Sequence, residues 1–111
     1  MTNRVQLGRI TGIARLDLRG ADLQNVRFER VDFSGAEAEG LRGEALQLVD
    51  CDLTAARLVG ADLRGARFVR VRLPGADLRD ADLTGAVFEE CDVRWVDWRG
   101  TTGGAVQRGC G

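Results

Sequence analysis

The amino-acid sequence repeats every five residues from Leu16 to Gly100, which gives 17 consecutive blocks with no insertion or deletion. Position one of the block is apolar in all 17 blocks, and position three is a large apolar residue in 15 of them, the exceptions being Ala38 and Gly43. Position two is acidic in ten blocks and arginine in five, and position five is rich in glycine. Positions one and three are therefore predicted to be buried, and the other three positions to face solvent.

A five-residue period fits neither of the two common secondary structures. A helix would rotate the apolar stripe around its axis, because its own period is 3.6 residues. A flat strand would alternate the stripe between its two faces, because five is an odd number. A chain that turns a corner after every block avoids both conflicts, and its backbone hydrogen bonds then run to the coils before and after it, about 4.8 Å away. Glycine near each corner suits the turn.

Four of the blocks, ADLQN, ADLRG, ADLRD and ADLTG, resemble the A-(D/N)-L-x-x unit of the pentapeptide-repeat proteins. The resemblance covers about three-quarters of the chain. It implies an all-β fold, a right-handed quadrilateral parallel β-helix (a solenoid) with four blocks, and hence 20 residues, per coil. The repeats over 16–100 then give a little over four coils, and about 4–5 if residues 1–15 form a first coil or a cap.

Residues 20 apart should then stack in columns. Phe28, Phe68 and Phe88 share one inward column, and Leu48 fills the gap between them. On the outside, Arg42, Arg57 and Arg72 each lie between acidic residues of the preceding and following coils, where they are predicted to relieve repulsion between stacked carboxylates.

The blocks with Ala38 and Gly43 at position three are the irregular part of the repeat. Leu41 and Leu46 stand nearby at position one, where alanine is usual. We interpret this as a volume swap, in which the inward bulk moves from position three to position one. The alternative is a bulge or loop over residues 36–45.

The three cysteines are predicted to be free thiols. Cys51 and Cys91 share an inward column two coils apart, with Val71 between them, which is beyond disulfide reach. With no histidine in the chain they suggest small core residues and no metal site. Cys110 lies in a glycine-rich segment and is either a reactive thiol or part of a mobile end.

Both ends of a β-helix need a cover. Trp98 falls on an inward position and is predicted to plug the last coil, whereas Trp95 falls on an outward one. Trp95 is predicted to fold over the edge as a cap, the alternative being an exposed contact for a partner. Residues 101–111 are predicted to be a flexible C-terminal tail.

One side of the predicted coil carries arginines at positions two and five, interrupted by acidic residues. It is either a solvated mixed-charge face or a docking strip for an anionic partner. With Trp95, the candidate partner-binding residues are Arg27, Arg30, Arg67 and Arg70.

Composition argues against several function classes. The chain has 16 arginines and 17 acidic residues, a net charge of −1 and no lysine or histidine. This balance predicts no direct nucleic-acid or membrane binding. No catalytic set, phosphate loop or metal-binding spacing appears, so we predict no enzyme activity and no cofactor. A cytoplasmic location is expected, because the first residues lack a signal-peptide pattern.

These observations predict a non-catalytic scaffold that acts as a protein-interaction module, with another protein as its partner. The resemblance implies an alternative, because some pentapeptide-repeat proteins mimic DNA, bind DNA gyrase or topoisomerase and protect it from quinolones or toxins. The near-neutral charge disfavours gyrase as a partner, since a DNA mimic needs dense negative charge. A structural solenoid without a ligand, and an end-to-end homodimer, remain open.

Overall fold

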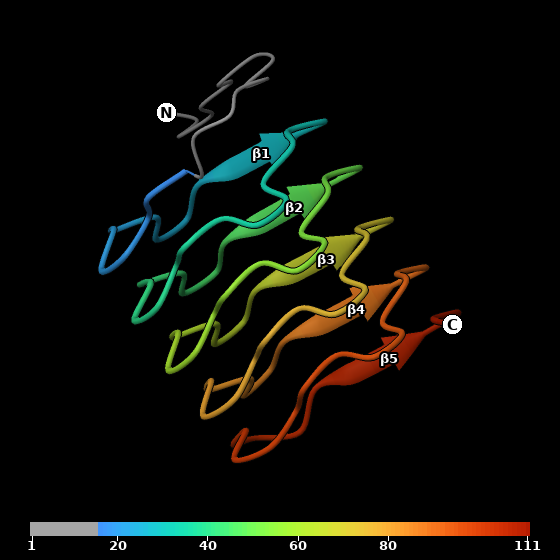
Figure 1. The fold of residues 1–111 in the computed structure, drawn as a ribbon. Helices are drawn as coiled ribbons and strands as arrows, with labels where there is room; N and C mark the ends of the chain where they lie inside the picture. The colour runs from blue at the N-terminus through green and yellow to red at the C-terminus, as the bar shows by residue number, and fades with distance from the viewer. Residues whose placement is uncertain (1–15) are drawn as a thin grey trace.

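The computed structural model describes residues 16–111, and the prediction of a first coil or cap over 1–15 lies outside them. The described chain is an all-β coil with one short strand per turn on one side (Figure 1). The strands are β1 (Arg27–Glu29), β2 (Gln47–Val49), β3 (Arg67–Val69), β4 (Val87–Glu89) and β5 (Val106–Arg108). They form a parallel sheet in the order β1-β2-β3-β4-β5, which is the stacking of successive coils that the sequence predicts.

The other three sides of the coil are joined by single parallel bridges between position-two residues 20 apart. Asp17 pairs with Glu37, Asp22 with Arg42, and Asp32 with Asp52, and each series continues through the following coils. Four such columns, one of them the strands, define a four-sided parallel β-helix, right-handed as parallel crossovers are. The predicted fold is confirmed.

The corners explain why the period is five. Position five has a positive φ in all 17 blocks, and nine of those residues are not glycine. At most corners the N–H of the next position one donates to the position-three carbonyl, as Ala66 does to Leu63 at 3.0 Å. A turn with a left-handed third residue is typical of type II, and glycine is the residue that adopts it without strain.

The core lies inside the coil and consists of residues from positions one and three only. No polar or charged residue within 16–111 is buried. Phe68 and Phe88 stack in parallel with their ring centroids 4.4 Å apart, as their shared column predicts. The Trp98 and Phe88 rings are nearly perpendicular, with their centroids 5.6 Å apart. This contact is consistent with the predicted role of Trp98 in closing the last coil.

The irregular blocks keep the coil, so residues 36–45 form no loop. Glu37 and Arg42 pair with residues of the next coil, and the Gly43 N–H donates to the Asp62 carbonyl at 2.7 Å. A Cβ at Gly43 would lie 3.2 Å from a Leu46 methyl and 3.1 Å from a Leu63 methyl. Leu46 therefore fills the space that a position-three side chain fills elsewhere, which is the predicted volume swap.

The prediction of a flexible tail over 101–111 is wrong for the structure, because this segment continues the coil. Thr102 pairs with Asp82, and β5 pairs with β4 over its whole length. The segment lies on the preceding coil because its backbone finds hydrogen-bond partners there, as in the Val106 N–H donated to the Ala86 carbonyl at 3.0 Å. Glycine-rich composition does not prevent this, since the partners are main-chain groups.

Candidate interaction surface

The aspartates at position two have a structural role at the corners. Each accepts a hydrogen bond from the backbone N–H of position four in its own block, at 2.8–3.2 Å. This is an Asx-type cap, which satisfies an N–H at the start of the turn. The nine aspartates are Asp17, Asp22, Asp32, Asp52, Asp62, Asp77, Asp82, Asp92 and Asp97. Backbone geometry therefore explains the abundance of Asp in the repeat.

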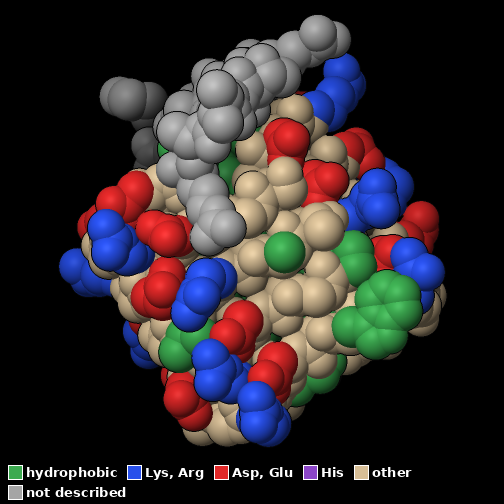
Figure 2. Space-filling model, in the orientation of Figure 1, with side chains coloured by type: hydrophobic (Ala, Val, Ile, Leu, Met, Phe, Trp, Pro, Cys, Tyr) green, Lys and Arg blue, Asp and Glu red, His purple; other side chains and the backbone are tan. Residues whose placement is uncertain are grey.

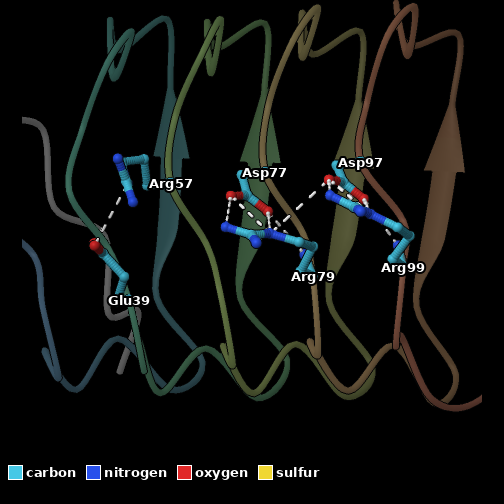
Figure 3. A network of polar contacts seen from close by, with 6 residues as sticks. All are labelled: Glu39, Arg57, Asp77, Arg79, Asp97 and Arg99. Carbon is cyan, nitrogen blue, oxygen red and sulfur yellow. Dashed lines mark hydrogen bonds and ion pairs between the residues drawn. The ribbon is translucent and has the colours of Figure 1, made fainter.

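Position four supplies the counter-charge for many of these aspartates. In five blocks an arginine at position four pairs with the aspartate two residues before it: Arg19, Arg64, Arg79, Arg94 and Arg99. Figure 3 shows this arrangement for Asp77 with Arg79 and Asp97 with Arg99. Arg79 also lies 3.9 Å from Asp97 of the next coil. Charges of both signs are consequently interspersed on the face that Figure 2 shows.

The position-two arginines are predicted to relieve repulsion between stacked carboxylates, but the arginines at position four also neutralise these acidic groups. The columns are as expected, since the backbone of Arg57 forms parallel β-bridges with Glu37 and with Asp77. Its side chain, however, pairs with Glu39 at 3.5 Å (Figure 3). The Asp-x-Arg spacing is visible in the sequence, and it would have identified the stronger intrablock pairs.

Hydrogen bonds from arginine lower the pKa of several capping aspartates. The side chain of Arg94 is the largest cause for Asp92, and that of Arg99 for Asp97, and both carboxyl pKa values fall from the usual 3.8 to about 2. The Ser34 hydroxyl likewise lowers the pKa of Asp32. These groups favour the ionised carboxylate in the folded chain.

We expect the free energy of unfolding to fall as pH decreases below about 4. The pKa of these aspartates is lower in the folded chain than the 3.8 expected when unfolded, so the folded state binds fewer protons. Their contribution is thus present above about pH 4 and is lost as pH falls toward about 2. Urea unfolding followed by circular dichroism at a series of pH values measures this, and a midpoint that stays constant or rises toward pH 2 would contradict it.

The predicted arginine strip forms a groove on the outer face of β1, β2 and β3. Its lining comprises three arginines, one glutamine and two valines, and it encloses about 310 Å³. The lining residues are Arg27, Gln47, Val49, Arg67, Val69 and Arg70. The structure therefore brings together three of the four predicted arginines. Arg30, the fourth, is not part of the lining, although its charge lies near Asp50.

Each groove arginine is half-exposed and has an acidic partner on the same side of the coil. Arg27 pairs with Glu29 at 2.8 Å and donates to the Gln47 side chain at 3.1 Å. Arg70 donates to Asp50 of the preceding coil at 2.7 Å. Arg67 reaches Glu89 at 3.2 Å. The groove thus has a polar rim, and Val49 and Val69 lie between its charged groups. The sequence did not identify these two valines as part of a site, because both stand at position four, which is predicted only to face solvent.

Trp95 does not act as a cap, which corrects the sequence-based prediction. Its side chain is 79% exposed, and the Arg94 guanidinium lies over its ring at 5.2 Å. It occupies a position-five corner with a φ of 59°. The alternative prediction, an exposed contact, is consistent with this placement.

Other kinds of site are not apparent in the described part of the chain. Residues 16–111 contain no cluster of three or more His, Cys, Asp or Glu side chains that could hold a metal ion. The same residues include no helix long and apolar enough to cross a membrane.

The fold and the surface together define a class of protein, a β-solenoid that presents fixed rows of side chains. A family model for pentapeptide repeats matches eight copies over residues 14–42, 47–85 and 70–100. The chain belongs to the pentapeptide-repeat family. No curated protein sequence matches it significantly.

Solved structures of pentapeptide-repeat proteins resemble this chain. Rfr23, a pentapeptide repeat protein from the cyanobacterium Cyanothece 51142, is 30% identical with a TM-score of 0.79, and the match covers 82% of this chain and 63% of that one. Trypsin-treated QnrB1, a plasmid-mediated fluoroquinolone resistance protein, is 23% identical with a TM-score of 0.59, over 95% of this chain and 53% of that one. The chain therefore spans less than two thirds of either relative, and QnrB1 supports the fold alone.

Proposed function

We propose that this chain is a non-catalytic protein-interaction module, and that the groove on β1, β2 and β3 binds an acidic segment of another protein. The observation that carries the proposal is the convergence of Arg27, Arg67 and Arg70 around two partly exposed valines. In a parallel β-helix, the backbone of each inner coil is held by hydrogen bonds to the coils on both sides. Such a surface needs little ordering when it binds, which lowers the entropic cost of association.

The chemistry of the groove selects the partner. Each guanidinium has five N–H donors in a planar fork, more than one carboxylate can accept, so an incoming carboxylate can share it. The existing pairs are exposed on both sides, with 56% of the Arg67 side chain and 29% of the Glu89 side chain accessible. Exposed pairs contribute about 0–1 kcal/mol, so a partner can displace them at little cost.

The apolar part of the groove adds a second requirement. Val49 and Val69 are register partners on β2 and β3, and they stand where Glu29 and Glu89 stand on β1 and β4. The middle of the groove thus has no carboxylate at this position and can contact apolar side chains of a partner. The segment that fits best is extended and has an acidic and an aliphatic residue two positions apart, because side chains at i and i+2 point to the same side.

We expect the chain to bind a short fluorescent peptide with the repeat Glu-Glu-Val-Val, in which glutamate and valine alternate along each face, and not the same peptide with lysine in place of glutamate. Arg67→Glu should weaken binding at least tenfold, because it removes a charge-assisted hydrogen bond and adds repulsion. Fluorescence anisotropy at low and high salt measures both effects, and the affinity should fall as salt rises.

Arg57→Glu is the matched control. Arg57 is also a position-two arginine, has a similarly exposed side chain and also pairs with a glutamate, but it lies on another side of the coil. The substitution changes the net charge by the same amount, so it should leave peptide binding nearly unchanged. Equal losses for Arg57→Glu and Arg67→Glu, or equal binding of the two peptides, would contradict the proposal.

Membership of the pentapeptide-repeat family leaves one alternative, a DNA mimic that acts on gyrase. The surface charges support it less well, because five of the nine capping aspartates that would imitate phosphates are paired with arginines two residues away. A supercoiling assay with purified gyrase and a fluoroquinolone separates the two functions. The interaction module is expected to give neither inhibition nor drug protection, whereas protection at micromolar protein would favour the mimic.

A further inference from the structure

A one-residue shortening of the repeat lies in the last coil. Thr102 pairs with Asp82, which is 20 residues earlier, but Val106 pairs with Val87, which is 19 residues earlier. One residue of the block that begins at Thr101 is therefore missing relative to the other corners. All residues after this corner move by one position, so that Ala105 rather than Val106 takes position one.

The shift places Cys110 in the inward column of Cys91. The Cys91 thiol lies 3.3 Å from the carbonyl oxygen of Phe68, and the Cys110 thiol lies 3.3 Å from that of Phe88, the equivalent residue one coil later. The backbone confirms the stacking, because the Gly111 N–H donates to the Cys91 carbonyl at 3.1 Å. The two cysteines are therefore direct neighbours on adjacent coils. Stacked residues lie about 4.8 Å apart, within the 4.4–6.8 Å range of Cα separations in disulfides.

The two thiols differ in exposure. Cys91 is 3% exposed, whereas Cys110 is partly exposed on the last coil. Burial raises the pKa of Cys91 to about 11, and the neighbouring Cys110 thiol contributes to this increase. Cys110 is therefore the group that an oxidant in solution can reach first, and Cys91 is the group positioned to attack it afterwards.

We propose that Cys91 and Cys110 form an intramolecular disulfide under oxidising conditions, which fastens the last coil to the one before it. A small-molecule disulfide such as oxidised glutathione supplies the oxidation. The Cys110 thiolate attacks one glutathione sulfur, a mixed disulfide forms, and the first reduced glutathione leaves after taking a proton. The Cys91 thiolate then attacks the Cys110 sulfur and releases the second reduced glutathione. Two thiols are oxidised and one glutathione disulfide is reduced.

The cross-link would act on a weakly anchored part of the fold. All three residues of β5 are exposed, and Val106 is 44% exposed. Main-chain hydrogen bonds to β4 hold the strand, while Ala105 and Cys110 are the inward side chains that pack on the core. A bond from Cys110 to Cys91 closes the chain between them and restricts separation of β5 from β4.

The test is incubation of the reduced 111-residue chain with oxidised glutathione, followed by tryptic peptide mapping. Cleavage after arginine places Cys91 in residues 80–94, Cys110 in residues 109–111 and Cys51 in residues 43–57. The expected product is a cross-linked peptide that joins 80–94 to 109–111. Oxidation should slow amide hydrogen exchange in β5 and raise the melting temperature by roughly 10 °C.

Cys51→Ala is the matched control, because Cys51 occupies the same column but has Val71 as its neighbour one coil later. This variant should still form the cross-link, and Cys110→Ser should lose both the cross-link and the slower exchange. A stable glutathione adduct on Cys110, a Cys110-linked dimer, or unmodified thiols in the folded chain would overturn the proposal.

Discussion

Phe68→Ala is expected to lower the free energy of unfolding by about 3–5 kcal/mol. The Phe68 ring is 1% exposed and stacks on Phe88 with an angle of 6° between the rings. Leu48 and Phe88 are its register partners on β2 and β4, so its removal opens a cavity between two coils. Because every coil is held by its neighbours, the cavity cannot close by movement of one segment alone.

Chemical denaturation of the variant measures this loss. Arg67→Ala in the same strand is the control, because its side chain is exposed and its removal should change stability by about 0.5 kcal/mol or less. A cost below about 1 kcal/mol for Phe68→Ala would show that position three does not face the core.

Gly43→Leu, which restores the usual residue type at position three, is expected to destabilise the protein by about 1–3 kcal/mol or more. The reason is that Leu46 and Leu63 already occupy the space, and even a Cβ at Gly43 would contact both at 3.1–3.2 Å. Leu46→Ala alone should cost about 2–5 kcal/mol, since Leu46 is 2% exposed.

Combination of the two substitutions tests the volume swap directly. Gly43→Leu with Leu46→Ala moves the side-chain volume back to position three, so the double variant should be more stable than the sum of the single effects predicts. A double-mutant cycle by urea denaturation measures the coupling, which we expect to exceed about 1 kcal/mol. Additive effects would mean that the two side chains do not share one space.

Much of the fold was predictable from the sequence, because the five-residue period and the apolar residues at positions one and three both require a chain that turns after every block. A block of five with apolar residues at positions one and three has one arrangement that keeps both inside. The stacking of Phe68 on Phe88 and the replacement of a side chain at Gly43 by Leu46 both followed from that frame.

The last coil was not predictable in the same way. One residue is missing from the frame in a segment whose glycines give no apolar marker, so the sequence offers no sign of where the repeat resumes. Backbone pairing to Asp82 and Val87 determines the register there, and it is a property of the folded coil. The prediction of a flexible tail failed for this reason, and it hid the contact between Cys91 and Cys110.

The candidate site was predictable only in part. The 20-residue spacing predicts that Arg27 and Arg67 lie on one side of the coil, but the groove also depends on Val49 and Val69 at position four. The repeat pattern predicts that position four faces solvent, whichever residue stands there. The predicted cap at Trp95 is wrong because a side chain that is 79% exposed covers no part of the coil, and the outward position alone does not tell whether a side chain folds back over the edge.

The measurement that tests the central claim most directly is a solution NMR spectrum of contacts between side-chain protons. If residues 20 apart stack inside a four-sided coil, cross-peaks should connect the methyl groups of Leu63 with those of Leu83, and the ring of Phe68 with that of Phe88. Cross-peaks from Leu63 only to residues near it in the sequence, with none to Leu83, would contradict the fold and every inference built on it.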